Sequence, residues 1–579
     1  MYDNKAADFY SPLEDCNQKM AAGAKFLVDN ISAAKNFFAG FLKYNNDFLI
    51  PFLLSSGYFT NAELSRTMKD SPGESFNEYM DLLEFNIDLL SRYFSGSFNA
   101  LNEYNNRELK NGVAAWYNTM FNLNGEKFNE FFSRQAEMLK NVATTYPQAI
   151  LDIEPEYGFH FERGENIKFA ETERFILYQI MPSDKKVEVD ETCKPLIIIP
   201  PFVLGTNILA FLPQQNKSYT HAFANKGIPT YIRIMKDINI TPEFQTMTAE
   251  DDALDTRYFC EKIKEKYRKK VTLNGYCQGG YSAVCNLLSG ELDDVVDALI
   301  TCVSPMDGTR SKGLANFLKS LPPRFNNLIY GTKKLPNGNK VADGDLMGWI
   351  YRLKSIEDEA PLASFFRDLF MLAPKKNGDP VKISKTAAAL NYWLQMERSD
   401  LPLSITEMSF ASYNTPITED GTLPVKLFGK KLNFKRINEK KIPWLICYGE
   451  KDDLVEKETA LAPLDYIDAE IAPFPKGHVA IATSWSNPDT EYALDKRFGK
   501  DNKYRGPVRF QLDLNEELKE STKTNRPATS PEKQSRKQSR TSSTTKSRTS
   551  SRTSSRTNNR ATAVKTAKKI RNKNTTVKS

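Results

Sequence analysis

The chain has 579 residues, of which 40% are hydrophobic and 26% charged, so it has room for about three to four domains and for a large core. Its formal charge is +7, but the charge is unevenly distributed. Residues 521–579 carry 17 Lys or Arg against one acid, Glu532, a net charge of +16, so residues 1–520 carry a net charge of −9. The division excludes a uniformly basic protein and a chain that is disordered throughout.

The cysteines are odd in number and form no CxxC pair. They are Cys16, Cys193, Cys260, Cys277, Cys285, Cys302 and Cys447. This spacing argues against a disulfide framework or a zinc site and favours a reducing compartment. The start, MYDNKAADFY, has no basic and no apolar signal region, and no run of about 18 apolar residues follows. We therefore expect a cytoplasmic protein without a signal peptide, a transmembrane segment or a metal site.

Residues 1–150 have the pattern of a helical N-terminal region. Ser71 is a candidate N-cap, with Pro72 in the first helical position and Glu74 completing a capping box. Apolar residues then recur at spacings of three and four in two stripes, Phe76, Tyr79, Met80, Leu83, Ile87, Leu90 and Phe94, and Phe128, Phe131, Phe132, Leu139 and Val142. We interpret both stripes as core; the alternative is a surface for oligomerisation or lipid.

From 155 to 515, short apolar runs alternate with helical stretches. The predicted strands are 175–180, 195–200, 229–234, 271–277, 298–304, 442–449 and 469–475. Continuous apolar strands separated by helices predict an α/β fold with a parallel sheet covered on both faces. Residues 305–435 interrupt this rhythm, are rich in Pro, Lys, Leu and aromatic residues, and show no clear strand. We interpret them as a cap insertion above the strand ends.

Residues 519–579 are basic, Ser/Thr-rich and of low complexity, as in RTSSTTKSRTSSRTSSRTNNR. This composition cannot bury enough apolar area to offset chain entropy, so we predict a disordered tail. Its evenly spaced arginines suit many weak contacts with a polyanion, and nucleic acid is the leading candidate. The alternative is an inert, solvated terminus.

The most informative segment is VTLNGYCQGG, residues 271–280, in which Gly275-x-Cys277-x-Gly279 joins a predicted strand to a predicted helix. This is the arrangement of a nucleophile elbow with Cys in place of Ser. The N-terminus of the following helix favours a thiolate and offers N–H groups to an oxyanion. Cys277 is therefore the candidate nucleophile; the alternative is a buried structural thiol.

An elbow nucleophile needs an acid and a base later in the chain. Of the three histidines, only His478 follows the elbow, on a Gly-containing turn after a predicted strand, whereas His221 has the pattern of a packing residue and the role of His160 stays open. Asp452 follows the strand and Gly turn of WLICYGEKDDLV and is the candidate orienting acid, with Asp453 as the alternative.

A second oxyanion donor is expected from the loop after an early strand, IPPFVLG at 199–205. The backbone N–H of Val203 is the first choice, together with that of Gln278, and the paired prolines stiffen the loop. The alternative is an ordinary turn that ends the strand.

Across residues 160–500 the chain resembles the polyhydroxyalkanoate synthases. PLIIIPPF, HAFANKGIPTYIRI, GYCQGG, YWLQMERSDLPLS, KDDLV and KGHVA are similar, in order, to segments of that family, and GYCQGG is the most specific of them. The chain departs from the family's usual residues at the loop FVLGTNILAF and at Tyr281, Asp453, Glu456 and Lys476. These departures leave Cys277, Asp452 and His478 in place and concern substrate choice and rate more than the reaction class.

The resemblance implies an α/β-hydrolase fold in which Cys277, Asp452 and His478 form the catalytic triad. It implies polymerisation of 3-hydroxyacyl-CoA through an acyl-cysteine, without a cofactor other than the CoA thioester substrate. It further implies a homodimer or a partner synthase subunit, at the surface of polyester granules. Two alternatives stay open: a Cys-dependent hydrolase, either a polyester depolymerase or a thioesterase, and a non-catalytic protein that binds granules or nucleic acid.

Overall fold

The computed structural model describes residues 28, 31–44, 72–320, 331–373 and 381–524. The predicted N-cap Ser71 and most of the predicted tail lie outside these residues. The proposed division into 1–150, 155–515 and 519–579 stays a prediction. Among the described residues, every helix is too short or too polar to cross a bilayer.

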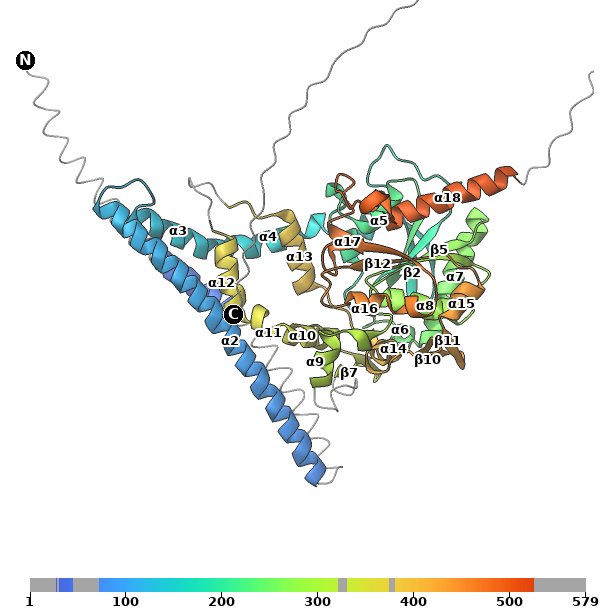
Figure 1. Ribbon diagram of the computed structural model, residues 1–579, viewed down its shortest axis with the longest axis horizontal. Helices are drawn as coiled ribbons and strands as arrows, with labels where there is room; N and C mark the ends of the chain where they lie inside the picture. The colour runs from blue at the N-terminus through green and yellow to red at the C-terminus, as the bar shows by residue number, and fades with distance from the viewer. Residues whose placement is uncertain (1–27, 29–30, 45–71, 321–330, 374–380, 525–579) are drawn as a thin grey trace, which may run out of the picture. The chain divides into compact units, whose positions relative to one another are not determined.

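An eight-stranded sheet forms the centre of the main body of the protein (Figure 1). Its strands are β1 (Ile167–Glu171), β2 (Phe175–Ile180), β3 (Leu196–Ile199), β4 (Thr230–Met235), β5 (Val271–Tyr276), β6 (Val296–Cys302), β12 (Trp444–Gly449) and β13 (Glu470–Phe474). They lie in the order β1-β2-β4-β3-β5-β6-β12-β13. The seven predicted strands are all present, and β1 was not predicted.

The sheet is parallel from β4 to β13, whereas β2 pairs antiparallel with both β1 and β4. The expectation of a wholly parallel sheet was therefore wrong at this edge. Along β2, buried and half-buried residues alternate over the first four positions, as in a strand near a sheet edge, whereas β3 and β5 are buried throughout. The strand order, the antiparallel second strand and the sharp turn after β5 are those of an α/β-hydrolase fold.

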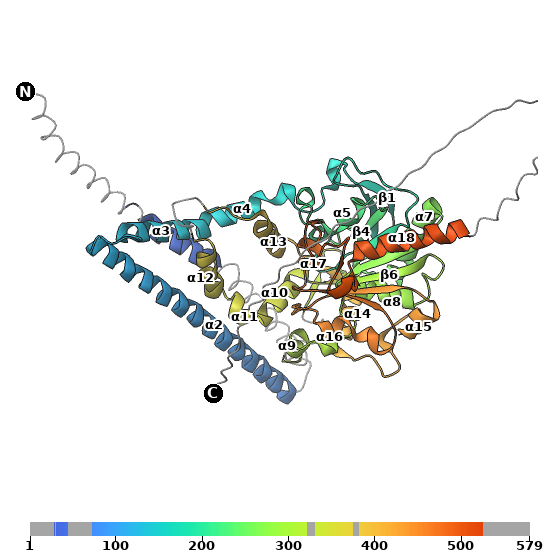
Figure 2. The ribbon, with the colours of Figure 1, turned by 45° about the horizontal axis from the view of Figure 1, so that its top comes forward.

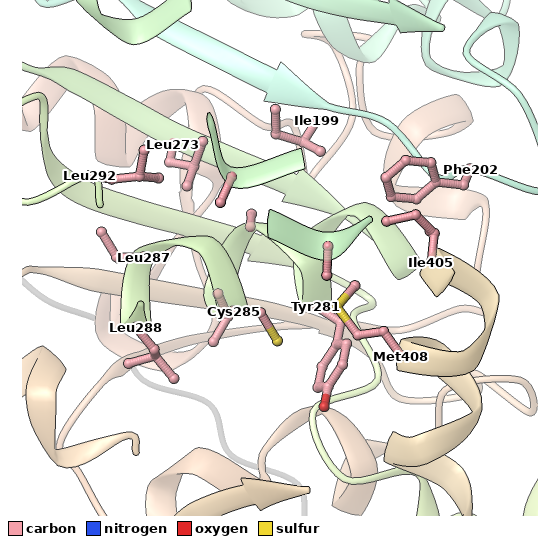
Figure 3. Close-up of a cluster of buried hydrophobic side chains, with 14 of the residues drawn as sticks. Ile199, Phe202, Leu273, Tyr281, Cys285, Leu287, Leu288, Leu292, Ile405 and Met408 are labelled. Carbon is pink, nitrogen blue, oxygen red and sulfur yellow. The ribbon is translucent and has the colours of Figure 1, made fainter. Parts of the chain in front are cut away.

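Helices cover both faces of the sheet (Figure 1). One face packs against α7 (Ala249–Tyr267), α8 (Gln278–Leu288), α14 (Leu403–Asn414) and α15 (Lys435–Glu439), and the other against α5 (Tyr219–Ala224), α13 (Lys385–Met396), α17 (Ala480–Thr483) and α18 (Pro507–Thr524). Figure 3 shows Ile405 and Met408 of α14 reaching toward Phe202 and Tyr281, so the base of the cap is part of the same core as α8.

The cap insertion is present but contains strands, contrary to the prediction. Besides α9 (Leu314–Ser320), α10 (Gly344–Lys354), α11 (Ile356–Glu359) and α12 (Pro361–Met371), it holds β7 (Thr332–Lys334), β8 (Lys340–Ala342), β9 (Leu401–Pro402), β10 (Thr422–Leu427) and β11 (Lys430–Asn433). These strands are short and partly polar, so they lack the apolar signal of the central sheet. Their turns were the better signal: Gly338 lies between β7 and β8, and Phe428 and Gly429, both with positive φ, join β10 to β11.

The N-terminal region is helical as predicted, with a helix over 31–44, α2 (Pro72–Met120), α3 (Phe128–Lys140), a π-helical turn (Asn141–Thr145) and α4 (Tyr146–Asp152). In Figure 2, α2 runs beside α11 and α12 of the cap. At the contact, a β-carbon on Gly96 would lie 1.9 Å from the carbonyl oxygen of Glu357, so only glycine allows this approach.

The interpretation of the first apolar stripe as core was wrong. Phe76, Met80, Leu83, Ile87, Leu90 and Phe94 are all exposed on α2. The face that packs against the cap instead carries Phe85, Leu89 and Tyr93, which contact Leu314 and Ile356 among others. Since α2 is apolar on more than one side, its periodicity alone does not identify the buried side. In the second stripe, Phe131 and Val142 are buried and Phe128 is exposed.

At the other end of the body, α18 continues to Thr524, past residue 519, where the disordered tail was predicted to begin. The segment LNEELKE is composed mostly of strong helix formers, which extends the helix although little of it is apolar. The helix is anchored near its start, where Gln511 Nε2 donates to the Lys194 carbonyl oxygen and the Lys194 N–H donates to Asn515 Oδ1.

Candidate active site

Cys277 occupies the turn between β5 and α8 with φ 51° and ψ −126°, a conformation that costs strain in any residue other than glycine. Its N–H donates to the carbonyl oxygen of Cys302 at 2.8 Å, which fixes the turn to β6. The neighbouring glycines allow the close packing: a β-carbon on Gly275 would lie 2.3 Å from Gly280 Cα, and one on Gly279 would lie 2.2 Å from Pro200 O. The predicted elbow geometry is therefore present.

The structure brings His478 and Asp452 together at the carboxyl ends of β13 and β12. His478 Nδ1 lies 2.9 Å from Asp452 Oδ2 and must donate, because an ionised carboxylate only accepts. The other carboxylate oxygen accepts the N–H groups of Leu454 and Val455, at 3.0 and 2.9 Å. Asp452 is thus held by three donors and can fix the tautomer of His478.

The remaining nitrogen of His478 lies on the side of the ring that is not bound to Asp452. Within the described residues, Nε2 is buried and lacks a hydrogen-bond partner of regular geometry, yet the imidazole and the Cys277 side chain interact. Burial disfavours the imidazolium, but the interactions with Asp452 and with the Cys277 side chain outweigh it and raise the pKa of His478 well above its ordinary 6.5. A protonated His478 beside Cys277 stabilises a thiolate, the reactive form of a cysteine nucleophile.

The other candidate residues have different partners, although Asp453 lines the same cavity as Cys277. The Asp453 side chain is 85% exposed and faces Lys354 Nζ at 3.9 Å rather than an imidazole. His221 is buried 2.7 Å from Ser218 Oγ, and burial lowers its pKa to about 4. His160 Nε2 contacts the Tyr157 carbonyl oxygen at 3.0 Å. Neither histidine is among the described residues that line the cavity beside Cys277.

Cys277 and His478 open into a cavity of about 580 Å³. Val203 and Gln278, the two predicted oxyanion donors, also line it, and in the described part of the chain neither of their N–H groups is taken by another acceptor. The cap contributes much of the wall, as expected from its position above the strand ends. Tyr44 and Tyr146 add a wall from the N-terminal helices, a contribution that the sequence did not predict.

Several supporting contacts were not predicted. Tyr276 Oη donates to the carbonyl oxygen of His478 at 2.9 Å, and Gln278 Nε2 donates to Ser409 Oγ on α14 at 2.5 Å. Glu456, where the resembled family usually has Pro, accepts the N–H groups of Lys312 and Gly313 at 3.0 and 2.7 Å and so ties the start of the cap to the Asp452 loop. Only the departure of Glu456 from the family pattern gave a signal for any of these.

In the described residues, no group of three or more His, Cys, Asp or Glu side chains is arranged to hold a metal ion. No family model and no curated protein matches the chain.

Similar solved structures include three named as esterases or hydrolases. A carboxylesterase, CesB, from Bacillus subtilis is 12% identical over 59% of this chain and 93% of its own, with a TM-score of 0.30. A meta-cleavage product hydrolase from Pseudomonas fluorescens is 14% identical over 60% of this chain and 94% of its own, with a TM-score of 0.30. A thermophilic esterase from Thermogutta terrifontis is 12% identical over 61% and 98%, with a TM-score of 0.29. The fold assignment itself rests on strand order and on the turn at Cys277.

Proposed function

We propose that this protein is an acyltransferase that polymerises 3-hydroxyacyl-CoA into a polyester through an acyl-Cys277 intermediate. The observation that carries the proposal is the pairing of Cys277 with the His478–Asp452 couple beside free oxyanion donors in a capped cavity. The resemblance of GYCQGG and the other motifs to the polyhydroxyalkanoate synthases supplies the substrate class.

Before the acylation step the Cys277 proton has passed to His478 Nε2, and the Cys277 thiolate attacks the thioester carbonyl carbon. The N–H groups of Val203 and Gln278 bind the oxyanion. The tetrahedral intermediate collapses with loss of CoA, whose sulfur takes the proton back from His478. One thioester replaces another, so the step is nearly thermoneutral and the acyl group remains activated.

In the elongation step, the 3-hydroxyl of a second 3-hydroxyacyl-CoA gives its proton to His478 and attacks the acyl-Cys277 carbonyl. An ester bond forms, the bond to sulfur breaks, and Cys277 leaves as a thiolate beside the protonated His478, which restores the starting pair. The lengthened acyl-CoA then re-acylates Cys277. Each step uses only protein groups and the CoA thioester.

The test is purified protein with 3-hydroxybutyryl-CoA, following released CoA with a thiol reagent and polymer by turbidity. CoA release together with insoluble polyester supports the proposal. CoA release with free 3-hydroxybutyrate and no polymer would instead identify a Cys-dependent hydrolase, because water would then be the acceptor. No release at all would favour a non-catalytic role. Light scattering of the active species tests the expected homodimer, and microscopy of polymer-containing cells tests granule localisation.

We also propose that residues 521–579, with their net charge of +16, tether the protein to a polyanion. Nucleic acid is the expected partner, and the absence of aromatic residues in this segment argues against base stacking. DNA binding by the full chain should weaken steeply with salt and vanish in a chain that ends at residue 520, while activity persists. Equal binding by the shortened chain would overturn the tether.

A further inference from the structure

The loop that carries Val203 is fixed on its N-terminal side by covalent chemistry. Pro200 and Pro201 have a locked φ and directly follow β3, and Pro200 packs against Gly279 of the elbow helix. The C-terminal side of the loop has no such restraint of its own, since Gly205, with φ 69°, adopts the left-handed conformation that glycine favours. The Val203 N–H lies in the peptide between Phe202, which is buried in the core, and Val203, so whatever holds residues 203–205 fixes the remaining side of that peptide and with it the direction of the N–H group.

The cap supplies that restraint. Trp393, near the end of α13 and only 4% exposed, donates its indole N–H to the carbonyl oxygen of Leu204 at 2.9 Å. Ser399 donates its backbone N–H to the carbonyl oxygen of Val203 at 3.3 Å. Two successive carbonyl groups of the loop are thus bound to one cap segment, residues 393–399.

A third contact comes from Glu397 in the same segment. Its Oε1 accepts from Asn207 Nδ2 at 2.8 Å, and a β-carbon on Gly205 would lie 3.2 Å from its Oε2. Asn207 Oδ1 in turn accepts the N–H of Phe159 at 2.9 Å, so the loop is held between the cap and the segment that precedes β1. Burial raises the pKa of Glu397 to about 7, against the opposing effects of Asn207 and Arg398.

The segment is itself rigid. The Arg398 guanidinium donates to the carbonyl oxygens of Leu394, at 2.8 Å, and of Glu397, at 2.5 Å, and closes the turn after α13. The Glu397 N–H donates to the Trp393 carbonyl oxygen at 3.2 Å. These hydrogen bonds hold Trp393 and Glu397 at a fixed separation, so the two side chains can hold the Val203 loop in one position.

We propose that the cap segment 393–399 positions the oxyanion hole, with Trp393 and Glu397 as positioning residues that act through the Val203 loop. The inference rests on the proposed function in one respect, that Val203 N–H binds the oxyanion of an acyl transfer. It adds that the cap is needed for the chemical step as well as for enclosing the substrate.

The test compares two reactions of Cys277 in the full-length protein. Acylation by p-nitrophenyl acetate forms an oxyanion, whereas alkylation by iodoacetamide, followed by mass at the Cys277 peptide, does not. Trp393→Phe keeps the ring and removes the N–H donor; we expect the acylation rate to fall tenfold to a hundredfold and the alkylation rate to stay within about twofold of wild type. A role in structure alone would move both rates together.

Trp444→Phe is the matched control, because Trp444 Nε1 likewise donates a buried hydrogen bond, to Thr301 Oγ1 at 2.9 Å, but within the sheet. It should leave both rates unchanged. Glu397→Gln keeps the acceptor for Asn207 and should acylate like wild type, whereas Glu397→Ala should resemble Trp393→Phe; this pair decides the matter if Trp393→Phe fails to fold.

Unchanged acylation in both Trp393→Phe and Glu397→Ala would overturn the inference, as would a parallel loss of alkylation. A wild-type protein that is alkylated but not acylated would overturn the oxyanion hole itself. A failure of the polymerisation proposal would give a different result. The wild-type protein would then be acylated normally by p-nitrophenyl acetate but would form no polymer from 3-hydroxybutyryl-CoA.

Discussion

The central sheet and α2 are both rich in apolar residues, but they use them differently. In β3 and β5 every residue is buried, because helices cover both faces of the sheet. In α2 the face with Phe85 and Leu89 is buried against the cap, while Ile87 and Phe94, on another side, are 58% and 53% exposed. Apolar residues of the same type thus serve as core in one region and as surface in the other.

The difference teaches what each pattern specifies. A strand between two helix layers has no solvent side, so a continuous apolar run fixes its burial. A helix that packs against the body along one side can carry apolar residues on its other sides. Its apolar periodicity then identifies an apolar face but does not show whether that face is buried. If this is correct, changes in the body should affect chemistry or stability strongly, and changes on the outer side of α2 should affect them little.

The largest effect is expected at Cys277. Cys277→Ala removes the nucleophile and should abolish CoA release from 3-hydroxybutyryl-CoA in a protein that still folds. Cys277→Ser should be strongly impaired, because a hydroxyl needs far more activation by His478 than a thiol does. Circular dichroism would establish folding.

Cys260→Ala, which removes a buried thiol in α7, is the matched control and should keep its activity per folded molecule. Polymer formation by a folded Cys277→Ala protein would contradict the assignment of the nucleophile.

The two neighbouring carboxylates should differ by orders of magnitude. Asp452→Asn should leave the fold intact, but it removes the carboxylate charge, and an amide NH2 turned toward His478 Nδ1 favours the wrong tautomer of the ring, so we expect turnover to fall by about 10⁴-fold. Asp453→Asn should change it only mildly, since this side chain is exposed and bound weakly to Lys354. Steady-state CoA release measures both, and equal or reversed effects would show that the wrong carboxylate had been chosen.

Sequence predicted the fold, and it selected the candidate site, where local chemistry is distinctive. The seven apolar strands, the Gly-flanked turn at Cys277 and the chain order of Cys277, Asp452 and His478 each depend on a few neighbouring residues. β1 escaped prediction because Ile167–Glu171 is short and largely exposed, and the cap strands because they are partly polar.

Long-range contacts could not be predicted in this way. Trp393 binds Leu204, and Glu456 binds Lys312 and Gly313, across more than a hundred residues of chain. No spacing rule in the sequence links such positions, because the path of the chain through the cap determines which residues meet. The wall that Tyr44 adds to the cavity is of the same kind.

Stability should depend on pH through a buried group of the body. Burial lowers the pKa of His221 from 6.5 to about 4, so between these values the unfolded chain binds a proton that the folded protein does not. Stability is then lost as pH falls from 6.5 toward 4, by about 2 kcal/mol between pH 7 and pH 5. Urea unfolding of wild type and of His221→Gln, at pH 7 and at pH 5, gives the free energy of unfolding at each pH. The contribution of His221 is the difference between the two proteins in how much that free energy changes. α2 contains no histidine and contributes no such dependence. An equal loss of stability in His221→Gln between pH 7 and pH 5 would show that a group other than His221 causes it.

The smallest effect is expected on the outer side of α2, where Ile87→Ala should change the free energy of unfolding by no more than about 0.5 kcal/mol. Ile87 is 58% exposed, so little apolar area returns to water on truncation, and alanine is the better helix former, which offsets part of that loss. Leu89→Ala, two residues away and 1% exposed, is the matched control and should cost about 2–5 kcal/mol, because it opens a cavity against α9 and α11. Urea unfolding, together with proteolysis of α2 to detect local undocking, measures both. A cost for Ile87→Ala similar to that of Leu89→Ala would mean that the outer side of α2 is covered in solution, and the contrast between helix and sheet would then disappear.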